Sequence, residues 1–509
     1  MGRADPFFAY SLLLRTIIFA FIPALTIAQY FRLRRGLHVF QLEGYKRTPF
    51  LRWCSRNPRR ALWLAATPQK KPLVMTGRAR RTLVVALALF VVTSLVLPGL
   101  AHLTWGGWPA DVGTWAVVTV LLIVGSPLLL TAADILLTPV QASINRRFTN
   151  QALARLAQID PLVVGITGSF GKTSTRAAVQ GLIAPSEQVI ATPGSFNTPL
   201  GVVRTINESL EELHHFLVVE MGARHRGDIA ELCRLVRPRI GVLTAIGSAH
   251  LESFGSLETI AATKYELIEA LPEDGLAVMN VDDAAVRTQA DSTTRVNVVR
   301  YGLLSEFHPH ITASNLSTTR SGTRFELVDT RSGESCEAST RLLGSHSIGH
   351  VLAGAAVALA AGRRPAELVE PIAALAPVEH RLQLIEGAGG VTVIDDAYNS
   401  NSDGAAAALE VLQALPARRR VVVTPGIIEL GPQQDRANEE LGRRAASVAD
   451  TVVVVARTNR AALLRGANGS SAQVVVVDSL AEAQAQLASL LGSGDAVLFE
   501  NDLPDHYEV

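Results

Sequence analysis

Cysteine is scarce in this chain, which has three among its 509 residues. Cys54, Cys233 and Cys336 lie far apart, so they form neither a CxxC pair nor the spacing of a zinc ribbon. Cysteines scattered in this way exclude a disulfide framework and are typical of a protein from a reducing compartment.

An excess of charge of either sign is also missing. The chain carries 47 Lys and Arg against 46 Asp and Glu, a formal net charge of +1, so no global basic field favours binding to nucleic acid. It has no internal repeat and no low-complexity tract apart from a richness in alanine, and no ABC-type signature that would indicate an ATP-driven transporter. Its length predicts about three domains rather than one.

Long uncharged runs are concentrated in the first 150 residues. Residues 82–110 and 112–133 contain no Lys, Arg, Asp or Glu, and each run is long enough to cross a hydrocarbon core of about 30 Å as a helix. Phe7–Phe31 is a third candidate in spite of Arg15, because a long arginine side chain can extend to the membrane interface. The alternative for this segment is a signal peptide, but no small-residue cleavage site follows it. We therefore predict a membrane module at 1–150, with helices at 7–31, 82–104 and 113–135.

Basic residues are distributed unevenly between the loops of this module. The loop 32–81 has fourteen Lys and Arg and a single acid, Glu43, whereas 101–112 has neither Lys nor Arg. The positive-inside rule places the first loop in the cytoplasm and the second outside. This topology predicts a multi-pass protein of the cytoplasmic membrane, with the chain beyond residue 150 in the cytoplasm. The basic loop either binds anionic membrane lipid or only sets the topology.

Apolar, β-branched runs alternate with helical patterns from residue 161 onward, as in a doubly wound, mostly parallel α/β sheet. One α/β domain is predicted at 151–378 and a second at 379–509, and a short join between them is expected to leave a ligand cleft. Strands are predicted at 162–167, 188–192, 215–220, 240–244 and 276–280 in the first domain, and at 391–395, 420–424, 451–455, 474–477 and 496–499 in the second. Residues 295–340 are expected to form a small antiparallel excursion.

Residues 163–175 read VVGITGSFGKTST, an apolar strand that enters a glycine-rich turn and then a helix. Gly168 and Gly171 allow backbone N–H groups to approach phosphate oxygens, and the helix N-terminus favours an anion. Lys172 adds a positive charge, and the Thr173 hydroxyl can ligate Mg²⁺. The first glycine stands at 165 instead of 166, one residue earlier than in a strict P-loop. The segment nevertheless predicts a protein that binds a nucleoside triphosphate.

A set of further segments resembles the Mur ligase family, and within it the members that add D-alanyl-D-alanine. The matching segments stand in the family's order and cover about 160–435: 165–175 (GITGSFGKTST), 192–201 (TPGSFNTPLG), 219–223 (VEMGA), 250–264 (HLESFGSLETIAATK), 279–283 (MNVDD), 380–383 (HRLQ), 395–401 (DDAYNSN) and 428–431 (IELG). The resemblance implies a P-loop central ATPase domain followed by a Rossmann-like C-terminal domain.

The activity that this resemblance implies is ATP-dependent amide ligation. A substrate carboxylate attacks the γ-phosphate to give an acyl phosphate, an amine attacks the acyl carbon, and phosphate leaves. The implied cofactors are ATP and Mg²⁺. The implied partners are an amino acid or dipeptide that supplies the amine, and a muropeptide-like acceptor that is either UDP-linked or lipid-linked.

The resemblance also implies roles for individual residues. The catalytic set is Lys172, His250, Lys264 and Arg381. The nucleotide set is Gly168, Ser169, Gly171, Lys172, Thr173, Ser174, Asn280, Arg381, Asp396 and Asn399. The metal set is Thr173, Glu220, His250 and Lys264, and the substrate set is Thr192, Ser195, Asn197 and Tyr398. In relatives the lysine that matches Lys264 can be carbamylated, and the sequence leaves this open here.

Three departures from the family pattern bear on the substrate. The membrane module stands where relatives carry a UDP-sugar-binding domain, the family's HNxxN reads HSIGH at 346–350, and a basic KGSR-like stretch is replaced by FENDLPD at 499–505. The acidic residues of this last stretch favour a substrate that carries an amine. We therefore expect a membrane-tethered ligase with a lipid-linked acceptor. The alternatives are a poly-γ-glutamate synthase-type ligase and a membrane scaffold that binds nucleotide without catalysis.

Overall fold

The computed structural model describes residues 6–61, 72–105, 108–194, 196–398 and 400–503. The chain divides into two compact units, Met1–Arg147 and Phe148–Val509. Two residues predicted at the site, Ser195 and Asn399, lie outside the described residues.

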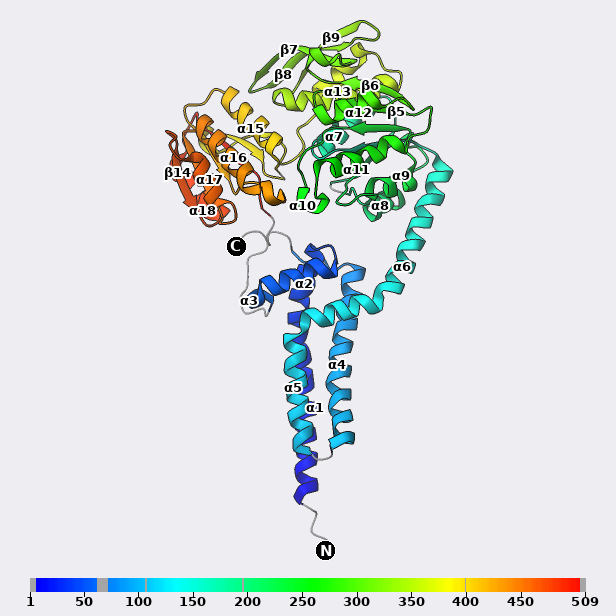
Figure 1. The fold of residues 1–509 in the computed structure, drawn as a ribbon, viewed down its shortest axis with the longest axis vertical. Helices are drawn as coiled ribbons and strands as arrows, with labels where there is room; N and C mark the ends of the chain where they lie inside the picture. Colours follow the sequence, from blue (N-terminus) through cyan, green and yellow to red (C-terminus); the bar gives the residue numbers. More distant parts are fainter. Residues whose placement is uncertain (1–5, 62–71, 106–107, 195, 399, 504–509) are drawn as a thin grey trace. The chain divides into compact units, whose positions relative to one another are not determined.

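The first unit consists of helices (Figure 1). These are α1 (Pro6–Leu42), α2 (Arg47–Arg56), α3 (Pro58–Ala61), α4 (Gly77–Trp105), α5 (Trp108–Val124) and the first part of α6 (Ser126–Ile159). Helices α1, α4 and α5 pack side by side. Large apolar side chains form the core, among them Leu37, Phe40, Phe50 and Phe90.

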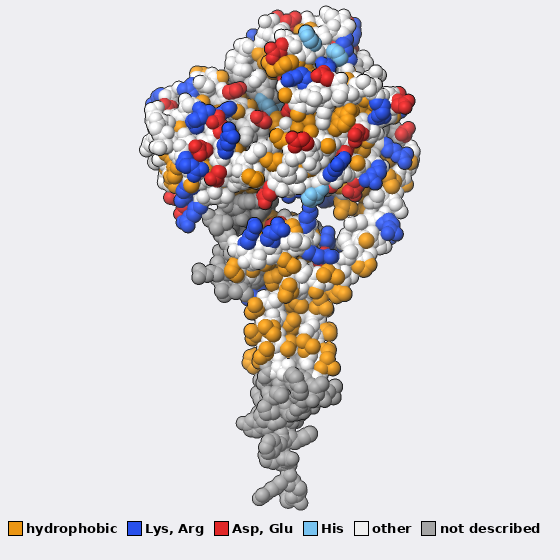
Figure 2. Space-filling model, in the orientation of Figure 1, with side chains coloured by type: hydrophobic (Ala, Val, Ile, Leu, Met, Phe, Trp, Pro, Cys, Tyr) orange, Lys and Arg blue, Asp and Glu red, His pale blue; other side chains and the backbone are white. Residues whose placement is uncertain are grey.

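Two helices of the described residues, Gly77–Leu97 and Ser126–Ile159, are long and apolar enough to cross a membrane by length and composition, and Thr114–Val124 is a shorter apolar helix. Apolar side chains also cover the outer surface of the described helices of the first unit in Figure 2. Val84 and Leu121 are each 64% exposed. Membrane crossing stays a prediction. The candidate 7–31 lies within α1, where side chains are described only from residue 21 onward.

The single helix predicted at 113–135 is wrong, because the structure has two helices there. Helix α5 ends at Val124 and α6 begins at Ser126, with Gly125 between them. Pro127 has no N–H to continue the α5 hydrogen-bond ladder and is tolerated in the first turn of the next helix. The Ser126 hydroxyl donates to the Ile123 carbonyl (2.6 Å) in its place.

A buried carboxylate connects three helical segments of this unit. Asp134 on α6 accepts hydrogen bonds from Arg47 Nε (2.8 Å) at the start of α2 and from Arg78 Nη2 (2.9 Å) at the start of α4. The Arg78 guanidinium also lies 4.2 Å from the ring centre of Tyr45. Because the Asp134 side chain is only 7% exposed, these two arginines supply the charges that a buried carboxylate requires.

The second unit begins with a nine-stranded sheet in the order β2-β3-β1-β4-β5-β6-β7-β8-β9. The strands are β1 (Leu162–Thr167), β2 (Val189–Ala191), β3 (Phe216–Glu220), β4 (Ile240–Leu243), β5 (Leu276–Asn280), β6 (Asn297–Tyr301), β7 (Ile311–Thr319), β8 (Gly322–Asp329) and β9 (Glu334–Thr340). Neighbours from β2 to β7 are parallel, and β7, β8 and β9 are antiparallel.

Helices cover both faces of this sheet. They are α7 (Lys172–Ile183), α8 (Pro199–Ser209), α9 (Asp228–Val236), α10 (Leu251–Phe254), α11 (Leu257–Glu269), α12 (Ala284–Ser292), α13 (Gly344–Ala360) and α14 (Val369–Ala374). Successive strand residues point to opposite faces, so Val163 joins the core beneath α8, α9 and α11, whereas Val164 joins the core beneath α7 and α13. This is the predicted doubly wound arrangement.

A six-stranded sheet follows, in the order β10-β11-β15-β12-β13-β14. Its strands are β10 (Gln383–Glu386), β11 (Thr392–Asp396), β12 (Arg420–Thr424), β13 (Thr451–Val455), β14 (Gln473–Val477) and β15 (Ala496–Glu500), and its helices are α15 (Ser402–Ala414), α16 (Gln434–Val448), α17 (Arg460–Ala467) and α18 (Leu480–Leu490). All neighbouring strands are parallel except β10, which runs antiparallel to β11.

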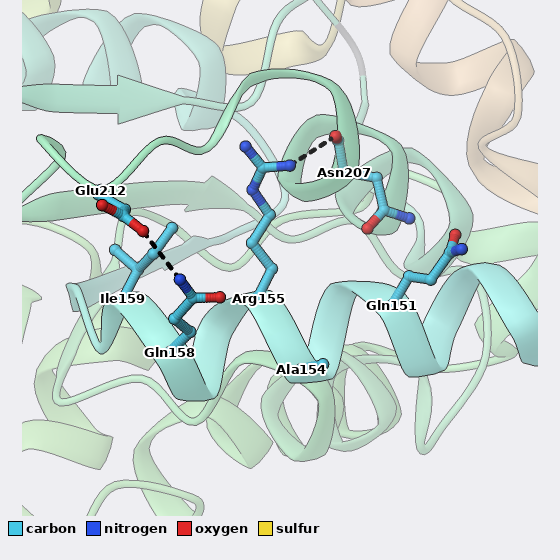
Figure 3. A pocket seen from close by; sticks show the side chains of 7 residues that line it. All are labelled: Gln151, Ala154, Arg155, Gln158, Ile159, Asn207 and Glu212. Carbon is cyan, nitrogen blue, oxygen red and sulfur yellow. Dashed lines mark hydrogen bonds between the residues drawn. The ribbon is translucent and has the colours of Figure 1, made fainter.

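The end of α6 is attached to the first sheet's domain by polar contacts. Gln158 donates to Glu212 (2.8 Å), and Arg155 donates to the backbone carbonyl of Asn207 at the end of α8 (3.3 Å). Figure 3 shows these side chains lining an open, polar groove between α6 and the α8 region. The last turns of α6 therefore belong structurally to the second unit.

Candidate active site

The glycine-rich turn between β1 and α7 is held in a conformation that requires glycine. Gly168 has φ +154° and Gly171 has φ +79°. A Cβ on Gly168 would stand 2.0 Å from Thr244 Oγ1, and one on Gly171 would stand 2.7 Å from the His350 ring. The Ser169 backbone N–H donates to the Ala245 carbonyl (2.8 Å), so the turn packs closely on the segment that follows β4.

Lys172, the first residue of α7, extends back over this turn. Its Nζ donates to the carbonyls of Gly168 (2.7 Å) and Ser169 (3.2 Å). Burial lowers the pKa of Lys172, which the negative charge of Glu220 partly offsets and the positive charge of Arg381 reinforces. The ammonium group thus stands at the cradle where phosphate oxygens bind in such loops.

Glu220 ends β3 with its carboxylate turned toward the start of α7 and only 2% of the residue exposed. Its Oε2 accepts from the Thr173 hydroxyl (2.9 Å), and its Oε1 accepts from the Asn197 amide (3.1 Å). Arg176 Nε lies 3.9 Å from Oε2. Two predicted metal ligands, Thr173 and Glu220, are therefore in direct contact.

Thr192 and Asn197, which are predicted to cover substrate, contact the same glutamate. The Thr192 hydroxyl accepts from the Glu220 backbone N–H (3.0 Å), and Thr192 is fully buried. The Asn197 carbonyl accepts from the Gly222 N–H (2.8 Å). These two residues orient Glu220, and their contact with substrate stays a prediction.

Lys264 lies on α11 and is only 3% exposed. Its Nζ is 5.8 Å from the ring centre of Phe254. Burial, reinforced by the charge of Lys172, lowers the pKa of Lys264 to about 7, although Asp228 and Glu266 oppose the shift. A lysine in this environment is a neutral amine in an appreciable fraction of molecules at neutral pH.

His250, which is predicted to bind a metal ion, contacts a carboxylate. Its Nδ1 forms a hydrogen bond with Glu429, which comes from the second α/β domain, and Arg224 lies 3.8 Å from the other oxygen of that carboxylate. Over the described residues, no group of three or more His, Cys, Asp or Glu could hold a metal ion. The pair connects the two α/β domains, and the metal role of His250 stays a prediction.

Asn280 at the end of β5 uses both ends of its amide within the protein. Its Nδ2 donates to the Thr244 carbonyl (2.9 Å), and its Oδ1 accepts from the Asp282 N–H (3.2 Å). These contacts stabilise the segment behind the phosphate loop, and each end of the amide keeps one further hydrogen-bonding position. The nucleotide contact of Asn280 stays a prediction.

The join between the domains carries Arg381, whose guanidinium lies 4.6 Å from the ring centre of Tyr398. Asp396 Oδ1 accepts from the Leu382 N–H (3.1 Å), and both His380 and Leu382 have positive φ. Asp396 thus fixes the join rather than pointing into solvent. Its residue exposure is 8%.

A small cavity lies beside α7, α13 and the join. It is lined by Ser174, Ala177, Ala178, Leu342, Ser347, His350, Leu375, Ala376, Val378 and Arg381. His350 Nδ1 is 3.2 Å from the Thr175 hydroxyl, and its ring is perpendicular to that of His346. Burial lowers the pKa of both histidines, so neutral imidazoles stand beside the phosphate loop.

Comparison with known proteins agrees with this arrangement. The Mur ligase middle domain family matches residues 166–358, and the Mur ligase glutamate ligase domain family matches residues 380–500. The UDP-N-acetylmuramoyl-tripeptide--D-alanyl-D-alanine ligase of Mycobacterium bovis is 36% identical over 362 residues, which cover 66% of this chain and 69% of that protein. The chain belongs to the Mur ligase family. It is therefore an ATP-dependent acid–amino-acid ligase.

Two other relatives of this Mur ligase support the same relationship. The Escherichia coli UDP-N-acetylmuramoyl-tripeptide--D-alanyl-D-alanine ligase is 33% identical over 310 residues, covering 60% of this chain and 66% of that protein. A MurF ligase from Thermotoga maritima, solved in complex with ADP, superposes with a TM-score of 0.63 at 28% identity and covers 70% of this chain and 80% of that one. These matches support ATP use by this ligase.

Four residues that contribute to the geometry of this Mur ligase were not assigned a role from the sequence: Arg176, His350, Glu429 and Glu500. Each meets its neighbours across a long stretch of sequence, for example Glu429 with His250. The segments HSIGH and FENDLPD drew attention to His350 and Glu500 only as departures from the family pattern, and IELG drew attention to Glu429 only as part of a match. Their contacts were not readable from local spacing.

Proposed function

We propose that this Mur ligase joins D-alanyl-D-alanine to a muramoyl-tripeptide-type acceptor in peptidoglycan synthesis. The observation that carries the proposal is the contact of Glu220 with Thr173 at the phosphate loop, in a chain 36% identical to a ligase named for that reaction. The acceptor carboxylate would attack the γ-phosphate in this region, and the amine would then attack the acyl phosphate.

The residues at this position fit a magnesium ion. The Thr173 hydroxyl and the Glu220 carboxylate are hard oxygen ligands next to a phosphate-binding turn, the chemistry that Mg²⁺ prefers. Thr173 and Glu220 would hold the ion, which would neutralise phosphoryl charge when bound. Lys172 would bind the phosphates, and Asn197 would keep the Glu220 carboxylate oriented.

Lys264 is the candidate for carbamylation. A pKa of about 7 leaves roughly half of these side chains as neutral amine at pH 7, and the neutral amine is the form that adds CO₂ with loss of a proton. A carbamate carbon signal from ¹³CO₂-equilibrated protein, present in the wild type and absent from Lys264→Gln, would support this assignment. No signal in either protein would contradict it.

The small cavity beside the phosphate loop has a volume of about 30 Å³, far below that of a nucleoside, so it would form only the inner edge of the nucleoside site. It adjoins α7 and carries Ser347 and His350 where relatives have asparagines. Neutral imidazole offers one donor and one acceptor, so it can replace an amide as a hydrogen-bonding partner. Arg381, at the edge of the same cavity, would reach the phosphates on closure of the domains.

We also propose that the first unit anchors the ligase in the cytoplasmic membrane. Two described helices have sufficient length and apolarity, and the basic loop 32–81 indicates which side is cytoplasmic. Anchoring would favour a lipid-linked acceptor by raising its effective concentration. The basic loop would bind anionic membrane lipid.

With Cys54, Cys233 and Cys336 replaced, His102→Cys should react with an impermeant thiol reagent in intact cells and Arg80→Cys should not; the reverse result would refute the topology.

The ligase assignment is tested with the full chain purified in detergent. ATP, Mg²⁺ and D-alanyl-D-alanine are supplied with either a UDP-linked or a lipid-linked muramoyl tripeptide, and phosphate release is measured together with product mass. Lys172→Ala should abolish turnover, whereas Arg443→Gln, an exposed residue of α16, should not. Normal ligation by Lys172→Ala would remove the phosphate-loop assignment. Equal activity on both acceptors would count against a lipid-linked substrate. A parallel reaction with glutamate as the only amino-acid substrate, followed by product mass, would reveal a poly-γ-glutamate synthase.

A further inference from the structure

Arg176 is a buried cation that the roles assigned so far do not use. It lies on α7, four residues after Lys172, and therefore on the same face of that helix. Its side chain is only 12% exposed. Its Nε is buried and has no hydrogen-bond partner among the described residues.

The nearest charge does not satisfy this donor. Glu220 Oε2 lies 3.9 Å from Arg176 Nε, within ion-pair range but too far for a hydrogen bond. That oxygen already accepts from Thr173 at 2.9 Å, and Oε1 accepts from Asn197 at 3.1 Å. A buried N–H group without an acceptor destabilises the folded protein. We therefore expect a bound ligand to supply the missing acceptor.

Burial lowers the pKa of Arg176, which the charge of Glu220 partly offsets. Arginine remains protonated under all physiological conditions, so the side chain keeps its full charge. A guanidinium offers parallel N–H groups that match the two oxygens of a carboxylate. Lysine and threonine, which the phosphate loop supplies at Lys172 and Thr173, do not have this geometry.

We propose that Arg176 binds the acceptor carboxylate that ATP activates, and holds it beside Thr173 and Glu220 for attack on the γ-phosphate. This inference rests on the proposed function, because it assigns a place to one substrate of that reaction. The reaction requires the carboxylate to approach both the phosphate loop and the metal ligands, and Arg176 lies one helical turn after Lys172 with its Nε 3.9 Å from Glu220 Oε2. Orientation of this kind contributes to the rate by positioning.

The test compares full-length wild type, Arg176→Lys and Arg176→Gln, with Arg443→Gln as a control on an exposed arginine of α16. Turnover is measured with Mg·ATP, D-alanyl-D-alanine and the UDP-linked or lipid-linked muramoyl tripeptide. We expect the KM for the tripeptide to rise about 100-fold in Arg176→Gln and about tenfold in Arg176→Lys, the range for loss of charged hydrogen bonds. The KM for ATP and the thermal midpoint should stay close to wild type.

A second readout does not depend on turnover. Titration calorimetry of the tripeptide, in the presence of a non-hydrolysable ATP analogue, should show the same order of affinities. An unchanged KM for the tripeptide, or a rise in the KM for ATP or in the Mg²⁺ requirement instead, would overturn the inference and leave Arg176 as a neutralising partner of Glu220. A wild-type protein that ligates neither tripeptide would overturn the proposed function, and this inference with it.

Discussion

Replacement of Glu500 by glutamine should stabilise the C-terminal domain at alkaline pH. Asp396 and Glu500 stand opposite each other at the ends of the paired strands β11 and β15, and they are 8% and 0% exposed. Burial raises the pKa of Asp396 to about 6 and the pKa of Glu500 well above its usual range. The charge of Asp396 raises the pKa of Glu500 further, whereas a hydrogen bond with Glu500 lowers the pKa of Asp396. The Ser400 hydroxyl donates to Glu500, but it does not remove the repulsion.

The sign of the pH effect follows from proton binding. Between pH 3.8 and about 6 the folded protein holds a proton on Asp396 that the unfolded chain has released, so the free energy of unfolding falls as the pH rises. The rise in pKa from 3.8 to about 6 corresponds to about 3 kcal/mol. Glu500→Gln keeps the Asp396 shift and removes the penalty that comes from the raised pKa of Glu500, because glutamine resembles protonated glutamate. The variant should therefore stay close to wild type near pH 5 and exceed its stability by about 1–3 kcal/mol at pH 8.

The assay must report on this domain alone. All five tryptophans, at 53, 63, 105, 108 and 115, lie in the first unit, so their fluorescence would follow the wrong part of the chain. Hydrogen exchange of peptides from β11 and β15, corrected for intrinsic rates at pH 5 and pH 8, gives local opening free energies. Glu386→Gln, an exposed change on β10, is the matched control. A Glu500→Gln protein that is less stable than wild type at pH 8, or that differs from it equally at both pH values, would refute the argument.

Three further results are expected. Gly168→Ala, whose Cβ would stand 2.0 Å from Thr244 Oγ1, should weaken ATP binding at least about tenfold by calorimetry; unchanged binding would show that the turn does not need glycine. Glu429→Gln removes the charge that faces His250, and it should speed limited proteolysis near residues 376–382 compared with Glu386→Gln; equal rates would show that the pair does not connect the domains. Asp134→Asn leaves two partly exposed arginines without their carboxylate, and it should lower the stability of the first unit by about 1–2 kcal/mol, measured by tryptophan fluorescence in detergent; an unchanged transition would contradict the proposed role of Asp134.

Local patterns predicted the regular elements that carry the nucleotide site. Strand β1 coincides with the predicted 162–167, because an apolar run is a property of consecutive residues. The pattern missed β10. Strand β10 is a short, antiparallel edge strand that exists only by pairing with β11. The excursion at 295–340 proved to be a continuation of the first sheet, through β6 and β7.

The sequence by itself determined the family, the phosphate loop, the α/β character and the uncharged helices of the first unit, because each depends on residues close together in the chain. Tertiary structure alone decided which polar groups face one another. Asp396 meets Glu500, His250 meets Glu429, and Arg176 reaches Glu220 with its Nε lacking a hydrogen-bond partner among the described residues. Electrostatic energies depend on the distance between two charged groups and on their burial. The positions of these residues in the sequence give neither quantity, because the partners lie far apart along the chain.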